Sequence, residues 1–180
     1  MWCSPRVDGT TIIRAKPRAF VSAFVQRIET GLLRGASSRR CRYVVTRHGD
    51  DGLAFHATNW LTAFNVGLND VELAVASDGR VSYTIQYRRW AAYALSLSAG
   101  LGLALGASFL VIDIRAYVER NAASRIPGLS TGQNVAVAWA MALFWGFVWP
   151  WILIAFHRRP VGRLMERLIT EVDAAAISGR

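Results

Sequence analysis

The sequence predicts an α+β domain, with one helix on a small antiparallel sheet, fused to a two-helix transmembrane hairpin and an amphipathic C-terminal helix. Hydrophobic residues make up 53% of the 180 residues, although the net charge is +9. Such a mixture indicates apolar blocks separated by basic ones. Residues 91–112 and 135–156 contain no charged residue, and residues 41–88 include stretches in which apolar and polar side chains alternate. These patterns predict a folded domain attached to membrane-spanning helices.

Residues 1–90 form the predicted domain, and its first main element is a helix. A short strand is possible at 10–14, after which Pro17 suits the first position of a helix. Apolar residues then recur at helical spacing, and Gly35 marks the predicted end: Phe20, Val21, Phe24, Val25, Ile28, Leu32 and Leu33. We expect this apolar face to cover a sheet, and a helix lying on the membrane surface is the alternative.

Two hairpins are predicted after this helix. Residues 41–48 and 53–58 flank the turn sequence GDDG, and residues 71–76 and 81–88 flank SDGR. In the last strand Val81, Tyr83, Ile85 and Tyr87 point to one face, which is the alternation of a half-buried sheet.

The segment between the hairpins, NWLTAFNVGLND, is rich in apolar residues for an exposed loop. We expect it to fill the domain core. The alternative is an apolar binding lip, formed by Trp60, Leu61 and Phe64, that dips into the membrane or holds a lipid-like ligand.

Residues 91–112 and 135–156 are each about 22 residues long, which gives a helix of roughly 33 Å, enough to cross a membrane. Buried helices of a soluble protein are the alternative, but core helices seldom run so long without a polar face. Residues 113–134 then form an extracytoplasmic loop, and residues 157–180 form a cytoplasmic amphipathic tail that docks on the domain or lies on the membrane.

Arginines favour one orientation of the hairpin. They are more frequent beside the outer ends of the two spans than in the loop, which predicts cytoplasmic termini: Arg80, Arg88, Arg89, Arg158, Arg159, Arg163 and Arg167 flank the spans, and Arg115, Arg120 and Arg125 lie in the loop. We therefore expect a multi-pass protein of a bacterial inner membrane.

Small residues recur every fourth position in both spans and predict close helix packing: Ser98, Gly102 and Gly106 in the first, and Ala138, Ala142 and Gly146 in the second. Packing within the hairpin is the first interpretation and a homo-oligomer the second. Pro150 lacks the amide that would bond to the Gly146 carbonyl, so a kink is predicted there. We also expect Pro160 to separate the second span from the tail helix.

Basic residues near the spans predict contact with anionic lipid headgroups: Arg39, Arg40, Arg42, Arg88, Arg89, Arg158 and Arg159. Nucleic acid is not expected, because the basic run lacks interleaved aromatic residues. His157 is expected to reach toward the headgroups. His48 and His56 would approach a metal site only if they faced one another across the first hairpin, so no metal and no cofactor are expected.

The sequence contains no GxSxG, P-loop, HExxH or dinucleotide-binding motif, so enzyme activity has no specific support. The first hypothesis is a non-enzymatic, membrane-anchored binding or interaction module, with the lipid bilayer and a protein partner or second copy as its contacts. The alternative is a subunit of an oligomeric transport or channel assembly. Neither span contains an ionisable residue, which argues against an ion pathway inside the hairpin.

Overall fold

The structure is a computed structural model that describes residues 4–33, 42–60, 62–63, 67–121, 123 and 125–179. The chain divides into two compact units. Residues 1–91 and 155–180 form the first, called the sheet unit, and residues 92–154 form the second, called the helix unit.

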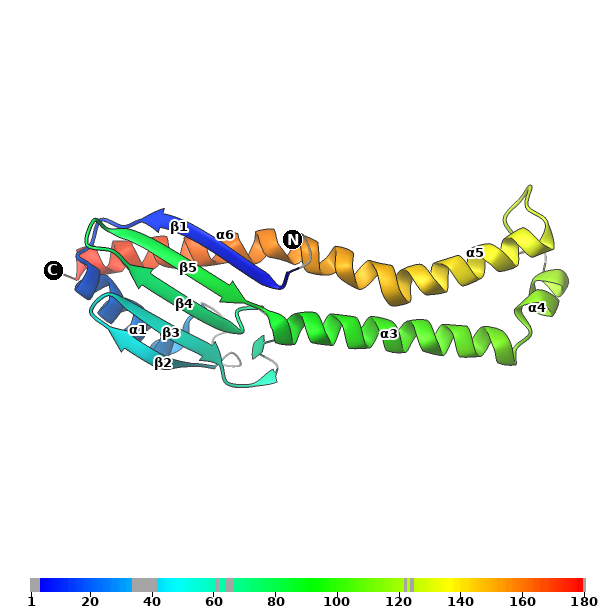
Figure 1. Cartoon of the computed structure of the whole chain (residues 1–180), viewed down its shortest axis with the longest axis horizontal. Coiled ribbons are helices and arrows are strands. Elements are labelled where there is room, and N and C mark those ends of the chain that lie inside the picture. The colour runs from blue at the N-terminus through cyan, green and yellow to red at the C-terminus, as the bar shows by residue number, and fades with distance from the viewer. Residues whose placement is uncertain are drawn as a thin grey trace. The chain divides into compact units, whose positions relative to one another are not determined.

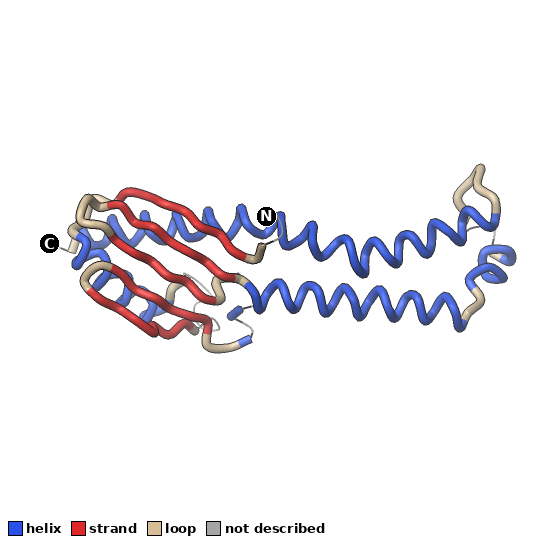
Figure 2. The backbone as a smooth tube through the Cα atoms, in the orientation of Figure 1, coloured by secondary structure: helices blue, strands red, loops and turns tan. Residues whose placement is uncertain are grey.

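The sheet unit contains a five-stranded antiparallel sheet in the order β1-β5-β4-β3-β2 (Figures 1 and 2). Its strands are β1 (Arg6–Ile12), β2 (Tyr43–Gly49), β3 (Gly52–Ala57), β4 (Asp70–Val75) and β5 (Arg80–Gln86). The α+β class predicted from the sequence is therefore confirmed. The first strand begins and ends earlier than the predicted 10–14, because the whole of β1 pairs with β5 from Arg6 opposite Gln86 to Ile12 opposite Arg80.

Two helices cover one face of this sheet, where the sequence predicted one (Figure 1). The first, α1 (Pro17–Gly31), buries Phe20, Val21, Phe24 and Ile28. The second is the C-terminal part of α6 (Trp149–Ser178), which adds to the same core Val161, Met165, Leu168, Ile169 and Val172. The apolar stripe of the tail thus packs on the sheet.

Two helix boundaries differ from the predicted ones. The helix α1 ends at Gly31, whose φ of 119° is a left-handed conformation that glycine adopts without strain. The predicted terminator, Gly35, lies outside the described residues. Pro160 does not separate the tail from the apolar segment, because it lies inside α6. An interior proline costs about 3 kcal/mol, and burial of the five apolar residues that follow it offsets this loss.

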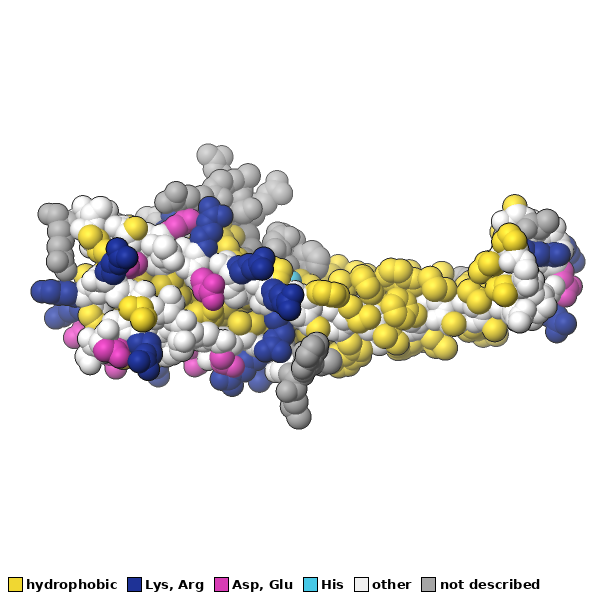
Figure 3. All heavy atoms as spheres, turned by 90° about the horizontal axis from the view of Figure 1, so that it is seen from above, with side chains coloured by type: hydrophobic (Ala, Val, Ile, Leu, Met, Phe, Trp, Pro, Cys, Tyr) yellow, Lys and Arg dark blue, Asp and Glu magenta, His cyan; other side chains and the backbone are white. Residues whose placement is uncertain are grey.

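The remaining long helix is α3 (Arg88–Val111), which starts three residues before the predicted span. In the helix unit it is followed by α4 (Ile114–Arg120) and α5 (Thr131–Leu143), then by a π-helical turn, η3 (Phe144–Val148), and the start of α6. Hydrophobic side chains gather along much of the visible face of the helix unit, and charged side chains appear at its end (Figure 3). Among the described residues, two helices are long and apolar enough to cross a membrane: α3 and the continuous helical stretch Thr131–Ser178.

Candidate functional site

The candidate site lies at one end of the sheet, where β5 ends and α3 begins. Cross-strand pairs define this end: Arg6 lies opposite Gln86, Gln86 opposite Asp70, and Asp70 opposite His56. Only Tyr87 separates β5 from α3. The residues at this sheet end therefore determine how the first turn of α3 is held.

Asn69 caps α3 from outside the helix. Its side chain is fully buried, and its Oδ1 accepts hydrogen bonds from the backbone amides of Arg89, at 3.0 Å, and Trp90, at 3.2 Å. Its Nδ2 donates to the Ala63 carbonyl at 2.8 Å. These two amides are the donors that an N-cap side chain normally satisfies, and the preceding residue, a tyrosine, has no short polar side chain for that purpose. The loop before β4 thereby supplies the cap.

An aromatic stack joins the first turn of α3 to α6 within the sheet unit. The His157 and Trp90 rings are parallel to within 4°, and their centroids are 3.9 Å apart. Tyr87 meets the same imidazole edge-on at 5.4 Å. Gly67, with a φ of 76°, lies against the imidazole so closely that a Cβ there would clash with its Nε2.

The His157 Nε2 atom is buried and has no hydrogen-bond partner among the described residues. His157 lies one residue beyond the apolar block 135–156. Burial lowers the pKa of His157 below the ordinary histidine value. The prediction that this side chain reaches toward headgroups is therefore wrong, because the stack holds the ring inside the sheet unit.

A group of arginines, called here the collar, surrounds this sheet end: Arg6, Arg42, Arg88, Arg89, Arg158 and Arg159. Arg42 lies beside the end of β3, because its carbonyl accepts from the Thr58 amide and its own amide donates to Thr62 Oγ1. Arg89 Nη1 donates to the Ala57 carbonyl at 3.0 Å. Arg39 and Arg40, which were predicted to share this role, lie outside the described residues.

The charges of the collar are largely uncompensated. Arg6 forms an ion pair with Asp8 at 2.9 Å. The pKa of Asp8 is lowered, chiefly by the hydrogen bond from Thr84 Oγ1 at 2.7 Å and further by the guanidinium groups of Arg6 and Arg158, against the opposing effect of burial. In the described part of the chain, the guanidinium groups of Arg42, Arg88, Arg158 and Arg159 form neither an ion pair nor a hydrogen bond. They are free to meet anions from outside the protein.

The small residues of the apolar helices meet inside the helix unit. A Cβ on Gly102 would lie 2.6 Å from the Gly146 Cα and 3.4 Å from the Ala142 carbonyl oxygen, and a Cβ on Gly146 would lie 3.5 Å from the Ser98 carbonyl oxygen. The third glycine, Gly106, faces the Trp139 ring. Ala138 is half-buried. These helices therefore approach at a point where only glycine fits on both sides.

The π-helical turn η3 directly precedes the Trp149–Pro150 pair. The Trp149 amide bonds to the Phe144 carbonyl, five residues back, instead of the usual four. Pro150, the residue predicted to kink the helix, is buried and has no amide to donate. The additional residue of the π turn lies in the same turn as Gly146.

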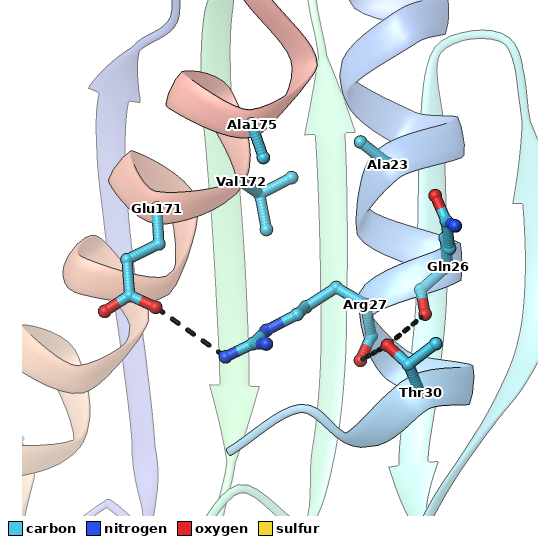
Figure 4. A pocket seen from close by; sticks show the side chains of 7 residues that line it. All are labelled: Ala23, Gln26, Arg27, Thr30, Glu171, Val172 and Ala175. Atoms are coloured by element: carbon cyan, nitrogen blue, oxygen red, sulfur yellow. Dashed lines mark hydrogen bonds and ion pairs between the residues drawn. The ribbon is translucent and has the colours of Figure 1, made fainter. Parts of the chain in front are cut away.

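Elsewhere among the described residues of the sheet unit, shallow grooves open to ligands lie beside α1. One, of about 220 Å³, lies between α1 and α6 and is lined by Ala23, Gln26, Arg27, Thr30, Glu171, Val172 and Ala175. Figure 4 shows Arg27 extending from α1 toward Glu171 of α6, with which it forms an ion pair at 3.7 Å. The carboxylate neutralises the cation, so this groove has no strong charge preference.

The space between α1 and the sheet is filled by packed aromatic rings. Phe24 lies 5.6 Å from Phe20 and 6.0 Å from Phe55, measured between ring centroids. Trp60, the described member of the predicted apolar lip, is 56% exposed, and Leu61 and Phe64 lie outside the described residues. The described part of the sheet unit thus shows a filled core.

The two histidines of the first hairpin are not opposite one another. His48 pairs with Leu53 and His56 with Val44, because the hairpin turn lies at Asp50 and Asp51. Within the described residues no group of three or more His, Cys, Asp or Glu side chains is arranged to hold a metal.

Family models, curated proteins and solved structures were all compared with this chain, and none matches it. The function therefore has to be argued from the residues at the sheet end and from the apolar helices.

Proposed function

We propose that this chain is a small integral membrane protein that holds its sheet unit against an anionic membrane surface as a non-enzymatic binding or interaction module. Residues 91–112 and 135–156 span the inner membrane of a bacterium, residues 113–134 form the extracytoplasmic loop, and both termini are cytoplasmic. The observation that carries the proposal is the collar, whose arginines flank the two points where the apolar blocks begin and end.

Burial supports the membrane part of the proposal. Only 11% of the most apolar stretch of α3, and 22% of that in Thr131–Ser178, is buried inside the protein. A core helix of a soluble protein would be mostly buried, whereas large apolar side chains here stay exposed: Leu97, Leu101, Leu103, Leu110, Val111, Leu143, Phe147 and Val148. The hydrocarbon core of a membrane would remove these side chains from water.

The positions of four arginines support the proposed binding to anionic lipid headgroups. Trp90 alone separates Arg88 and Arg89 from the first apolar block, and His157 alone separates the second block from Arg158 and Arg159, so all four arginines would lie at headgroup depth. A basic residue near an anionic leaflet contributes about 1 kcal/mol. The amides that begin α3 are already bonded to Asn69, so headgroup phosphates would be bound by guanidinium groups and not by the helix terminus.

The collar predicts a lipid preference that can be measured on the full chain. In zwitterionic detergent, added phosphatidylglycerol should raise the melting temperature more than added phosphatidylcholine. The triple variant Arg88→Gln, Arg158→Gln, Arg159→Gln should lose most of this difference, since three arginines correspond to about 3 kcal/mol, or about 100-fold in affinity.

A matched control removes the same charge at the opposite end of the sheet, with Arg18→Gln, Arg47→Gln and Arg80→Gln. These arginines lie near the β2–β3 turn or at the start of β5, so the control should keep the lipid-dependent shift. An undiminished shift in the collar variant would refute lipid binding by the collar.

The alternative, a subunit of a transport or channel assembly, has less support. Gly102 and Gly146 already pack against each other within one chain. A homo-oligomer or a protein partner would therefore have to use other surfaces.

A further inference from the structure

Lipid binding does not explain why the partly buried imidazole of His157 has a buried Nε2 atom. The sheet unit places a group that can gain a proton between the first turn of α3 and the loop before β4. Trp90 covers one face of the ring, Tyr87 meets it edge-on, and Gly67 closes the side of Nε2. Burial opposes a charge on this ring, and the attraction between an imidazolium and the face of Trp90 offsets part of that cost.

A proton on this ring would have no acceptor in the described surroundings. Nε2 is buried without a partner, and the nearby Gly67 carbonyl already accepts the Asn69 amide at 3.1 Å. An imidazolium there would contain a buried N–H donor with nothing to bond to, which is unfavourable. Opening the stack would let water solvate it.

The charged residues near His157 also disfavour its protonation. The elements packed against His157 have four arginines next to the stack, Arg88 and Arg89 on α3 and Arg158 and Arg159 on α6. Asp70, which follows Asn69 at the start of β4, forms no ion pair with the imidazole, and Asp8 on β1, whose pKa Arg158 helps to lower, is paired with Arg6. Residues 64–66 of this loop have the sequence FNV, which contains no ionisable side chain.

We propose that the His157–Trp90 stack is a proton-sensitive latch, in which protonation of His157 releases the first turn of α3 from α6 and from the loop that contains Gly67. The latch is closed when the ring is neutral and opens on acidification. It gives the sheet unit a response to local pH at the point where the first apolar helix begins, and it goes beyond lipid binding because it needs no lipid.

The direction and size of the response follow from proton linkage. In the opened latch the exposed ring has a pKa near the ordinary value of about 6.5, whereas the closed latch keeps the ring neutral to lower pH. Both states are neutral at pH 7.5, so the latch is unaffected there. At pH 5 the open state gains a proton that the closed state resists, and the opening equilibrium rises by up to about 30-fold.

Hydrogen exchange at two backbone amides would report the opening directly. The Arg89 and Trp90 amides are bonded to Asn69 when the turn is docked. In the full chain in detergent, their protection factors, corrected for the intrinsic exchange rate at each pH, should fall several-fold to about 30-fold between pH 7.5 and 5. The variant His157→Phe keeps an aromatic ring against Trp90 but cannot gain a proton, so its protection should not change with pH.

The control is His48→Phe on β2, where the histidine is exposed. It should keep the full pH response. Constant protection in the wild type, or an unchanged response in His157→Phe, would overturn the latch. If the phenylalanine variant does not fold, the imidazole proton signals of the wild type decide: a midpoint for His157 below that of a free histidine peptide supports the latch, and an equal or higher midpoint refutes it.

Discussion

Replacing Asn69 with leucine tests whether the loop before β4 really holds the start of α3. Leucine has a similar volume and fits an apolar surrounding, so packing changes little, while all three hydrogen bonds of the side chain are lost. The substitution leaves the Ala63 carbonyl and the amides of Arg89 and Trp90 without their partner. Any loss of stability therefore reports the cap.

The size of the loss can be estimated from burial. Ala63 is 1% exposed, so its abandoned carbonyl should cost about 1–3 kcal/mol. The two amides begin a helix turn that water can reach, since Arg89 is exposed and Trp90 half-buried, so their loss resembles removal of an ordinary N-cap, about 1 kcal/mol. We expect Asn69→Leu to lower the free energy of unfolding of the sheet unit by about 2–4 kcal/mol.

The measurement is equilibrium unfolding of the full chain in mild detergent with guanidinium chloride, followed by near-ultraviolet circular dichroism. Asn121→Ala is the control, because Asn121 is exposed and its side chain makes a single local hydrogen bond, to the Tyr117 carbonyl. It should change stability by less than about 0.5 kcal/mol. A loss for Asn69→Leu no larger than this control would refute the capping role.

The structure predicts the direction of the change in stability for three further substitutions. Gly102→Ala should destabilise the full chain in detergent by about 1–3 kcal/mol, because the added Cβ would meet the Gly146 backbone. Gly100 is on the same helix and a Cβ there would have no atom within 4 Å, so Gly100→Ala should be neutral or stabilising by up to about 1 kcal/mol. Equal shifts of the melting temperature in the two variants would contradict the close contact. Gly67→Ala should cost about 2 kcal/mol or more, since alanine strains at a φ of 76° and clashes with the histidine ring, and a wild-type melting temperature would argue against that packing. Asp173→Ala should lower the free energy of unfolding by about 1–2 kcal/mol, because the Asp173 carboxylate accepts hydrogen bonds from the backbone amides of residues 14 and 15 at 2.9–3.1 Å and so connects α6 to the segment before α1. Chemical unfolding of the variant tests this prediction.

The sheet could be predicted from the sequence because its strands follow simple patterns. Val81, Tyr83 and Ile85 alternate with polar residues and face the core, and Asp78 and Gly79 mark the turn between β4 and β5. The first strand was harder to locate, because it lies at the sheet edge and none of its residues is fully buried. Edge strands carry a weaker hydrophobic signal than central ones.

The sequence predicts the amphipathic character of the tail helix, but not that Pro160 lies inside α6. Proline predicts a helix end from local geometry, whereas the outcome here depends on the buried residues Val161 and Met165 that follow it. Their contacts with the sheet are non-local. Local propensity cannot anticipate such an override.

Most collar arginines could be predicted because they lie beside the apolar blocks in the sequence. The Asn69 cap and the His157 stack could not, because they join residues far apart in sequence. Asn69 bonds to amides about 20 positions later, and the stack joins Trp90 to His157. An asparagine before a strand ordinarily indicates a turn. A histidine beside arginines at the end of an apolar block ordinarily indicates an interfacial residue. Only the tertiary structure shows that Asn69 is buried and that His157 stacks on Trp90.

The side of the membrane on which each part lies tests the central claim most directly. In a chain with Cys3→Ser and Cys41→Ser, single cysteines would be placed by Ser77→Cys, in the β4–β5 turn, or by Ala123→Cys, in the loop after α4, both at exposed positions. A membrane-impermeant maleimide is then added to intact cells and to inverted membrane vesicles. The account predicts that the first cysteine reacts only in inverted vesicles and the second only in intact cells. Reaction of both cysteines from the same side would contradict a membrane-spanning hairpin.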